Sequence, residues 1–458
     1  MKQVALDVLL ADGRAPDHPV CHDGNRFVQW QEFADRVATH AAGFSARPER
    51  RWLLTAGRPL EFAILLFALM HAGKDVVLPP NTQRGTLERL AGAHDAVASV
   101  AIVGEPVALT PLDPRSARID LYTSGSTGQP KRVRKTLAQF QAEISVLECL
   151  WGEAIGDAAI VATVPHHHIY GLLFRIFWPL GSGRVFDDVT CAHPDVLIER
   201  LATFGASALV SSPAQLSRLP DLMALTALQP ALQPNSWIIF SSGGPLSFDV
   251  AAEYRRQLGC APTEVFGSTE TGGVAWRRQQ DDDLWTPFPG MRMSADAEGA
   301  LLLRSPFLPG GPLEDAAPWR TGDAIECMSD GRFRLLGRLD RIVKIEEKRL
   351  SLPELECYLA EHPWIAAVAA VALAGSRQHV GVVLVLTATG RAQLAAQGRR
   401  AMTRLLRLHL AGRFEAVLLP RRWRFLDALP ISESGKLTQA GVAALFAPVS
   451  EQDESAAA

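Results

Sequence analysis

The chain has 458 residues, which suggests two or three domains at about 150 residues each. Hydrophobic residues make up 48% of the sequence and charged residues 21%, as in a globular protein. The formal net charge of −3 excludes a chain that binds nucleic acid through an overall positive charge. The six cysteines are scattered without a CxxC pair, so the sequence indicates neither a zinc site nor a disulfide framework. We therefore expect a cytoplasmic protein.

The two ends of the chain and its longest apolar run predict neither a secretory signal nor a membrane span. Asp7 interrupts the first apolar stretch, which a signal sequence would leave uncharged. FAILLFALM at 62–70 is well short of the ~18 apolar residues that cross a bilayer, so it predicts a buried helix. The small and acidic residues at the C-terminal end predict a disordered tail over 447–458.

The first three quarters of the chain alternate between short apolar runs and amphipathic stretches. ARIDLY at 117–122, AAIVATVP at 158–165, SALVSSP at 207–213 and WIIFSSGGP at 237–245 predict strands, each with a helical stretch nearby. This alternation is typical of a layered α/β domain.

A different pattern follows Gly337. SLPELECYLAEH at 351–362 predicts a helix, IAAVAAVAL at 365–373 and VGVVLVLT at 380–387 predict strands, and RAMTRLLRLHLAG at 400–412 predicts another helix. We predict an N-terminal α/β domain over 1–337, a hinge over 338–340 and a small α+β domain over 341–446.

The stretch LYTSGSTGQPKR at 121–132 follows a predicted strand and combines small residues, hydroxyls and two cations. Such a loop lets backbone N–H groups and hydroxyls approach a phosphate closely, because no large side chain stands in the way. It lacks the GxxxxGK[ST] spacing of an ordinary nucleotide triphosphatase. By itself, a surface linker explains this stretch equally well.

Four further motifs follow in order: FGSTETGG at 266–273, WRTGD at 319–323, GRLDRIVKIEEKRLSLPELE at 337–356 and LPISESGK at 429–436. Together with the loop, they resemble the ANL superfamily of adenylate-forming enzymes, which includes acyl- and aryl-CoA ligases and peptide-synthetase adenylation domains. The resemblance implies a large layered α/β domain and a small mobile α+β lid. It also implies an acid–thiol ligase that makes an acyl-AMP from ATP with loss of pyrophosphate, and then passes the acyl group to a thiol.

The resemblance implies roles for individual residues. The β- and γ-phosphates would be bound by Ser124, Ser126, Thr127, Gly128 and Lys131. In the later motifs, Thr269 would contact the α-phosphate, Glu270 would bind Mg²⁺, and Asp323 would accept the ribose hydroxyls with Arg338 nearby. Asp340 would be the hinge residue, and Lys436 the lid lysine of the adenylation step.

VPHHHIYGL at 164–172 and SSGGPLS at 241–247 bear on the acid. Three consecutive histidines point in different directions, so zinc is not favoured. The family pattern assigns His168 to the acid's carboxylate, with a buried core histidine as the alternative. Gly243 and Gly244 would lie along the adenine and the acid. The predicted substrate pocket, which suits a small aryl acid such as 4-hydroxybenzoate, comprises His168, Tyr170, Ser211 and Gly243.

The segment 391–424 contains nine arginines and one acidic residue, Glu415. A solvated helix face would explain this charge, and an acidic acyl carrier protein that docks there would explain it too. Glu347 stands where the family usually has a glycine that lines the thiol channel, which disfavours free CoA. The chain also resembles short ligases that load an aryl acid onto a carrier in aryl-polyene (xanthomonadin-type) pigment pathways. An aryl-CoA ligase and a catalytically inactive nucleotide-binding regulator are the alternatives.

Overall fold

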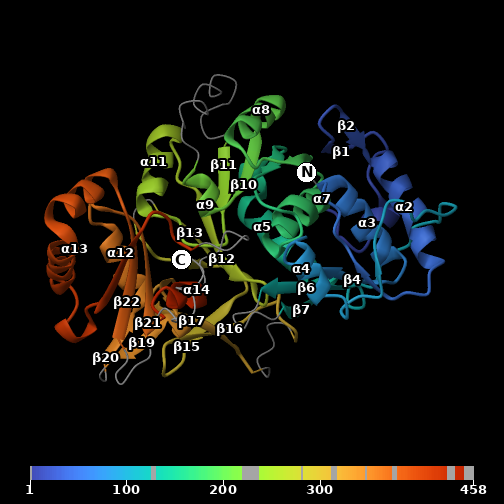
Figure 1. Cartoon of the computed structure of the whole chain (residues 1–458). Helices are drawn as coiled ribbons and strands as arrows, with labels where there is room; N and C mark the ends of the chain where they lie inside the picture. The colour runs from blue at the N-terminus through green and yellow to red at the C-terminus, as the bar shows by residue number, and fades with distance from the viewer. Residues whose placement is uncertain are drawn as a thin grey trace, which may run out of the picture. The chain divides into compact units, whose positions relative to one another are not determined.

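The computed structural model describes residues 3–124, 130–218, 237–279, 282–310, 317–345, 348–373, 379–430 and 439–447. These residues form two compact units (Figure 1). The first comprises Met1–Arg292 and Arg304–Pro318, and the second comprises Met293–Leu303 and Trp319–Ala458. The predicted hinge at 338–340 concerns motion and stays a prediction.

The first unit contains a mixed sheet in the order β14-β13-β12-β11-β10-β8-β9-β1-β2. Among strands β8 to β12, every two that are adjacent in the sheet are parallel, as the predicted α/β alternation requires. The strands are β1 (Pro19–His22), β2 (Phe27–Gln29), β8 (Ala159–Ala162), β9 (Phe186–Thr190), β10 (Ser207–Ser211), β11 (Trp237–Ser241), β12 (Thr263–Ser268), β13 (Gly272–Arg278) and β14 (Thr286–Pro287).

A second sheet of this unit has the order β5-β3-β4-β6-β7 and ends in an antiparallel hairpin. Its strands are β3 (Arg51–Leu53), β4 (Asp75–Leu78), β5 (Ala96–Val97), β6 (Arg118–Ser124) and β7 (Pro130–Thr136). The helices of the unit are α1 (Leu9–Asp12), α2 (Trp30–Ser45), α3 (Pro59–His71), α4 (Arg84–Arg89), α5 (Leu137–Ile155), α6 (Ile169–Gly171), a π-helix (Leu172–Phe177), α7 (Trp178–Ser182), α8 (Pro194–Phe204), α9 (Pro213–Leu216) and α11 (Phe248–Leu258).

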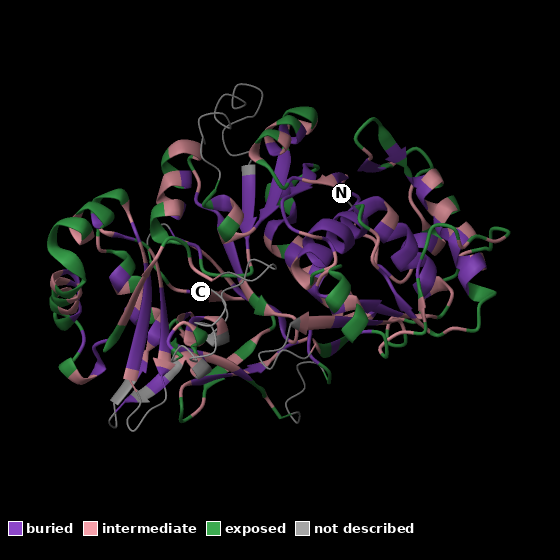
Figure 2. Ribbon diagram, viewed as in Figure 1, coloured by how far each residue is buried: buried purple, intermediate pink, exposed green. Residues whose placement is uncertain are grey.

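The core of the first unit lies on both faces of the larger sheet. Along β10, Ala208 and Val210 join the cluster around α2, α3 and α5, whereas Leu209 joins the cluster under α8 and α11. This alternation follows from the two-residue period of a strand. The predicted buried helix at 62–70 is confirmed as the centre of α3, which Figure 2 shows in the colour of buried residues.

The second unit contains the sheet β15-β16-β17-β18, the hairpin β19-β20 and the sheet β21-β22-β23. The strands are β15 (Arg292–Ala295), β16 (Ala300–Arg304), β17 (Trp319–Cys327), β18 (Phe333–Arg338), β19 (Ile342–Ile345), β20 (Lys348–Ser351), β21 (Ile365–Leu373), β22 (His379–Leu386) and β23 (Arg422–Leu426). The helices are α12 (Leu352–Ala360), α13 (Ala388–Ala411) and α14 (Gln439–Ala444), with short 3-10 turns at Leu339–Arg341 and Ala416–Leu418.

Helices cover both faces of the sheet β21-β22-β23. Val382 and Leu384 pack with α12 and α13, whereas Val383 packs with Val442 and Phe446 in and after α14. The helices and strands predicted after residue 350 are thereby confirmed, with α13 beginning twelve residues earlier than the predicted 400–412. Gly398 interrupts it with a φ of +75°, which explains why the apolar periodicity starts only after that residue.

In the described parts of the chain, no helix is long and apolar enough to cross a membrane.

Candidate active site

The predicted phosphate loop joins the two strands of a hairpin. Ser124 at the end of β6 pairs with Pro130 at the start of β7, and Thr123 pairs with Lys131. Three predicted phosphate ligands, Ser126, Thr127 and Gly128, lie outside the described residues, as does the side chain of Ser124. Lys131 is the predicted phosphate ligand whose side chain the structure describes.

Lys131 and Glu270 form an ion pair, with 2.7 Å between Lys131 Nζ and Glu270 Oε1. The lysine side chain is 60% exposed and the glutamate side chain 25%, so the pair lies at the surface of the first unit. Burial acts to raise the pKa of Glu270, but the hydrogen bond from Lys131 and contacts with the turn itself outweigh it and lower the pKa. Glu270 is therefore a carboxylate at neutral pH.

The turn between β12 and β13 presents Thr269 and Glu270, and two hydroxyls brace it. Ser268 Oγ and Thr271 Oγ1 are 3.0 Å apart, the Ser268 N–H donates to Thr271 Oγ1 at 3.1 Å, and the Thr271 N–H donates to Ser268 Oγ at 3.2 Å. Gly267 lies on the adjacent strand, where an added Cβ would be 2.2 Å from the Gly272 carbonyl oxygen. The FGSTETGG motif therefore forms a tight hairpin turn because of its hydroxyls and glycines.

Two buried charged residues that the sequence analysis did not single out contact this turn from the interior. Lys135 Nζ donates to the Glu270 carbonyl oxygen at 2.9 Å and to the Phe307 carbonyl oxygen at 3.0 Å. Glu143 Oε1 accepts the Gly273 N–H at 2.6 Å. The sequence held a signal for both. Lys135 follows the buried Val133 by two residues and so lies on the same face of β7, and Glu143 lies on the apolar stripe of α5.

Gly243 and Gly244 lie in the loop that follows β11, at the carboxyl end of parallel strands β10 and β11. Both are exposed, and an added Cβ would meet no protein atom within 4 Å at either position, although the φ of +94° at Gly243 favours glycine. Ser242 fixes the start of the loop, because its hydroxyl donates to the Val265 carbonyl oxygen at 2.8 Å. In α/β sheets this edge is where ligands usually bind.

The predicted substrate-pocket residues differ in exposure. His168 is exposed at the first residue before α6, and its ring lies 4.7 Å from that of His167. The Tyr170 hydroxyl is buried near the backbone of Ser211, and burial raises the pKa of Tyr170 well above its usual value. Tyr170 and Ser211 thus come together, and His168 lies two residues before Tyr170, just ahead of the same short helix.

Of the other two histidines of the triplet, His166 lies in the core and His167 is partly buried. His166 is buried, its Nε2 lies 2.8 Å from the Ala56 carbonyl oxygen, and burial lowers its pKa to about 3. Burial also lowers the pKa of His167. Among the described residues, no group of three or more His, Cys, Asp or Glu side chains could hold a metal ion.

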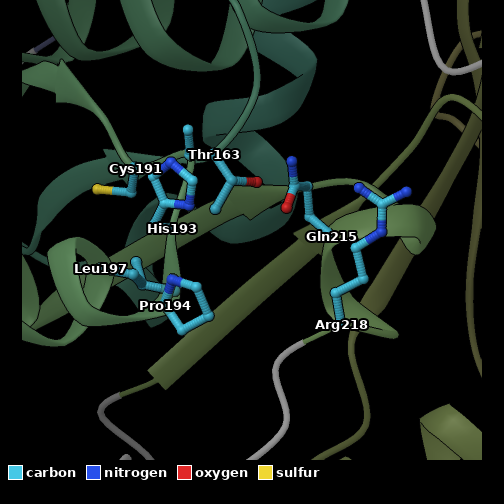
Figure 3. A pocket seen from close by; sticks show the side chains of 8 residues that line it. Thr163, Cys191, His193, Pro194, Leu197, Gln215 and Arg218 are labelled. Atoms are coloured by element: carbon cyan, nitrogen blue, oxygen red, sulfur yellow. The ribbon is translucent and has the colours of Figure 1, made fainter.

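A cavity of about 230 Å³ lies beyond the carboxyl ends of β8 and β10, lined by Thr163, Cys191, Ala192, His193, Pro194, Leu197, Gln215 and Arg218. Figure 3 shows Cys191 and Leu197 on one side and Gln215 and Arg218 on the other, with Thr163 and His193 between them. The Thr163 hydroxyl is 2.8 Å from that of Ser211, which connects the cavity wall to a predicted substrate residue. Burial raises the pKa of Cys191 to about 12, so this residue is a thiol.

In the second unit, Asp323 and Arg338 are paired across strands β17 and β18, with Asp323 Oδ1 3.7 Å from Arg338 Nη1. Gly322 lets the arginine lie against the backbone here, because an added Cβ would be 2.6 Å from Arg338 Nη2 and would displace the guanidinium. Asp323 of the WRTGD motif therefore lies on a strand beside Arg338, and the role of the two residues at the ribose stays a prediction. The backbone of Asp340 lies in the 3-10 turn Leu339–Arg341, and its side chain, Glu347 and Lys436 lie outside the described residues.

Comparisons with known proteins agree with these motifs. The family model described as AMP-binding enzyme matches residues 93–299. The chain is 28% identical over 375 residues to a 4-coumarate–CoA ligase of Rhodobacter capsulatus, covering 81% of this chain and 84% of that protein. It is 28% identical over 364 residues to an anthranilate–CoA ligase of Pseudomonas aeruginosa, covering 72% of this chain and 66% of that protein.

The fold also matches a solved structure, ATP-bound MatB from Rhodopseudomonas palustris, with a TM-score of 0.79 and 18% identity. The match covers 97% of this chain and 99% of that one, and it confirms the predicted α/β adenylation fold. Together, the family model and the two ligases show an AMP-binding, adenylate-forming acid–thiol ligase, whose motifs resemble those of the ANL superfamily.

Proposed function

We propose that this ligase uses ATP and Mg²⁺ to convert a small aryl acid, such as 4-hydroxybenzoate, into its acyl-AMP with release of pyrophosphate. The acyl group then passes to the phosphopantetheine thiol of an acyl carrier protein. The proposal rests on the ion pair between Lys131 and Glu270. Lys131 lies beside the glycine-rich loop, and Glu270 lies in the FGSTETGG turn. The lysine cation suits the phosphates of a nucleotide triphosphate, and the glutamate carboxylate suits the metal ion that such a nucleotide carries.

The residues present fit Mg²⁺. Mg²⁺ usually takes one or two protein carboxylates and completes its shell with water and phosphate oxygens, so a cluster of three acidic side chains is not required. Glu270 offers a carboxylate that is three quarters buried and ionised. When bound, the ion would neutralise phosphate charge, while Lys131 would leave Glu270 for the β- or γ-phosphate and Thr269 would contact the α-phosphate.

The remaining nucleotide contacts are assigned by motif. Ser124, Ser126, Thr127 and Gly128 would complete the phosphate loop, and Gly243 and Gly244 would lie along the adenine. Asp323 would accept the ribose hydroxyls beside Arg338. Lys436 would stabilise charge in the adenylation transition state, where a weak carboxylate nucleophile attacks an anionic phosphate.

The aryl acid is inferred from the pocket residues and from the relatives. His168 would orient the carboxylate, and Tyr170, Ser211 and Gly243 would enclose the ring. The two relatives described above are named for 4-coumarate and anthranilate, both of which are small aryl acids. 4-Hydroxybenzoate, and with it a place in aryl-polyene (xanthomonadin-type) pigment synthesis, is the specific candidate.

A carrier protein is favoured as the thiol donor by the charge on α13. Arg400, Arg404 and Arg407 line one shallow groove of about 410 Å³ together with Leu408, which is 64% exposed. Cations around an apolar residue suit an acidic helix of a carrier protein, because complementary charge steers association. Several arginines of the segment also have internal contacts: Arg407 donates to the Pro420 carbonyl oxygen, Arg413 pairs with Glu354, and Arg422 packs over Phe446.

Free CoA is the second candidate acceptor, because both ligases named above are CoA ligases. One assay series tests the whole proposal: pyrophosphate release with a panel of aryl and fatty acids, followed by thioester formation with a carrier protein or with CoA. We expect release with aryl acids and faster transfer to the carrier. Absence of acid-dependent pyrophosphate release would refute the adenylation proposal, and equal or faster transfer to CoA would refute the carrier.

A further inference from the structure

Lys135 and Glu143 are both only 2% exposed, although neither forms an ion pair within the described residues. Each directs its charge to backbone groups. Lys135 donates to the carbonyl oxygens of Glu270 and Phe307, and Glu143 accepts from the N–H of Gly273. The two side chains therefore bind opposite ends of the segment 270–273.

Burying these charges is costly for the fold. Removing an ionised group from water costs several kcal/mol, and hydrogen bonds offset only part of that. Burial lowers the pKa of Lys135, and it raises the pKa of Glu143 to about 7. An apolar residue at either position would avoid that cost but would leave the bonded backbone groups unsatisfied, so the role of the pair is tied to this backbone.

The turn is shaped to fit this pair. At Gly272, where φ is +71°, an added Cβ would be 2.5 Å from Glu143 Oε2. At Gly273 an added Cβ would be 2.5 Å from the ring of Phe288. Because neither glycine has a Cβ, the backbone can approach Glu143 closely. The hydrogen bond from the Gly273 N–H to Glu143 then fixes the position of the turn in the core.

We propose that Lys135 and Glu143 are positioning residues that hold the 270–273 backbone, and thereby set where Thr269 and Glu270 meet the nucleotide and its Mg²⁺. The inference rests on the proposed function and adds two residues to it. Lys135 follows the phosphate loop by only a few residues along β7, so one strand positions both the loop's Lys131 and the metal-binding turn.

The test compares variants by calorimetric titration with ATP and Mg²⁺ in the absence of acid, and by pyrophosphate release over a range of Mg²⁺ concentrations. Glu143→Leu removes the acceptor and leaves a buried N–H unsatisfied, so we expect ATP·Mg²⁺ affinity to fall about tenfold and half-saturation to need more Mg²⁺. Lys135→Met should act in the same direction. Glu143→Gln keeps an acceptor oxygen and should restore affinity to within about twofold of the wild type.

Glu148→Gln is the matched control, because Glu148 is another carboxylate of α5 with strong internal contacts. It accepts hydrogen bonds from Trp178 at 2.7 Å and from Arg184 at 2.5 Å, and has no contact with the turn. It should lower the melting temperature without changing the Mg²⁺ dependence.

Wild-type release without any acid dependence would refute the proposed function itself. With an active wild type, unchanged Mg²⁺ half-saturation and ATP·Mg²⁺ affinity in both Glu143→Leu and Lys135→Met would overturn the positioning role. A loss in Glu143→Gln as large as in Glu143→Leu would overturn it as well. If Glu143→Leu does not fold, Glu143→Gln and Lys135→Met still decide between these outcomes.

Discussion

Lys131 and Glu270 are 139 positions apart in the sequence, yet their charged atoms lie 2.7 Å from each other. The hairpin β6-β7 supplies the lysine and the hairpin β12-β13 supplies the glutamate. Two hairpins from different sheets thus meet, and each supplies a group suited to one part of a metal-bound triphosphate.

Glu270→Gln tests this arrangement. The amide keeps the shape of the side chain but cannot provide the charge that a metal ion and Lys131 need. We expect acid-dependent pyrophosphate release to fall by about a hundredfold, a typical cost for losing one group that stabilises transition-state charge. Glu88→Gln, which breaks the exposed pair with Arg84, is the control and should leave the rate unchanged. A rate within threefold of wild type would remove Glu270 from the metal site.

Asp323→Ala tests the second unit. Loss of the acceptor should leave the ribose hydroxyls without their partner and weaken ATP binding by roughly 1 to 3 kcal/mol. The control is Asp330→Ala, which removes an exposed pair with Arg332 in a turn of the same unit. Unchanged ATP affinity by calorimetry would mean that Asp323 has only a structural role in β17.

Most of the fold could be predicted from the sequence because its buried elements are apolar runs that alternate with amphipathic stretches. The strands around 159–162, 207–211 and 237–241 are short apolar runs, and α3 is apolar on every side, so burial decides their structure. The start of α13 could not be predicted, because its first residues are exposed and lack an apolar stripe.

The candidate site was predicted only in part. Asp323 and Arg338 form a pair because β17 and β18 align them, which agrees with their grouping by motif. Motifs could not reveal that Lys131 would contact Glu270, since that contact depends on how two sheets pack. Lys135 and Glu143 were missed because a motif search passes over charged residues at core positions, although their strand and helix periods mark them as buried.

Lys436→Ala tests the lid lysine of the proposed mechanism. If the residue acts only in the adenylation transition state, the variant should lose acid-dependent pyrophosphate release and keep ATP binding within a few fold. Transfer from supplied acyl-AMP to the thiol should continue, because that half-reaction does not need the lysine. Adenylation near the wild-type rate would remove Lys436 from the mechanism.

Glu143 makes stability depend on pH. Burial raises the pKa of Glu143 from about 4.5 to about 7, so between these values the folded protein binds a proton that the unfolded chain has lost. The resulting stabilisation is complete below pH 4.5, falls as pH rises, and is lost above about pH 7, with a size of up to about 3 kcal/mol. Glu143→Gln cannot titrate, so its melting temperature relative to wild type should be higher at pH 8 than at pH 5. Scanning calorimetry at both pH values measures this difference, and a constant difference would contradict the raised pKa.

Reversal of two arginines in the α13 groove tests the proposed carrier protein. Arg404→Glu with Arg407→Glu should slow acyl transfer to an acidic carrier by tenfold or more, because steering by charge would turn into repulsion. Adenylation should be unchanged, since neither residue is assigned to the nucleotide or the acid. Transfer by the wild type should also weaken as salt rises, because exposed charges are screened beyond about 8 Å at physiological ionic strength.

Arg47→Glu with Arg115→Glu makes the same charge change on exposed residues of the first unit and controls for net charge. Transfer to the carrier that is insensitive to salt and to the α13 reversal would place carrier docking elsewhere, and a preference for CoA would identify an aryl-CoA ligase.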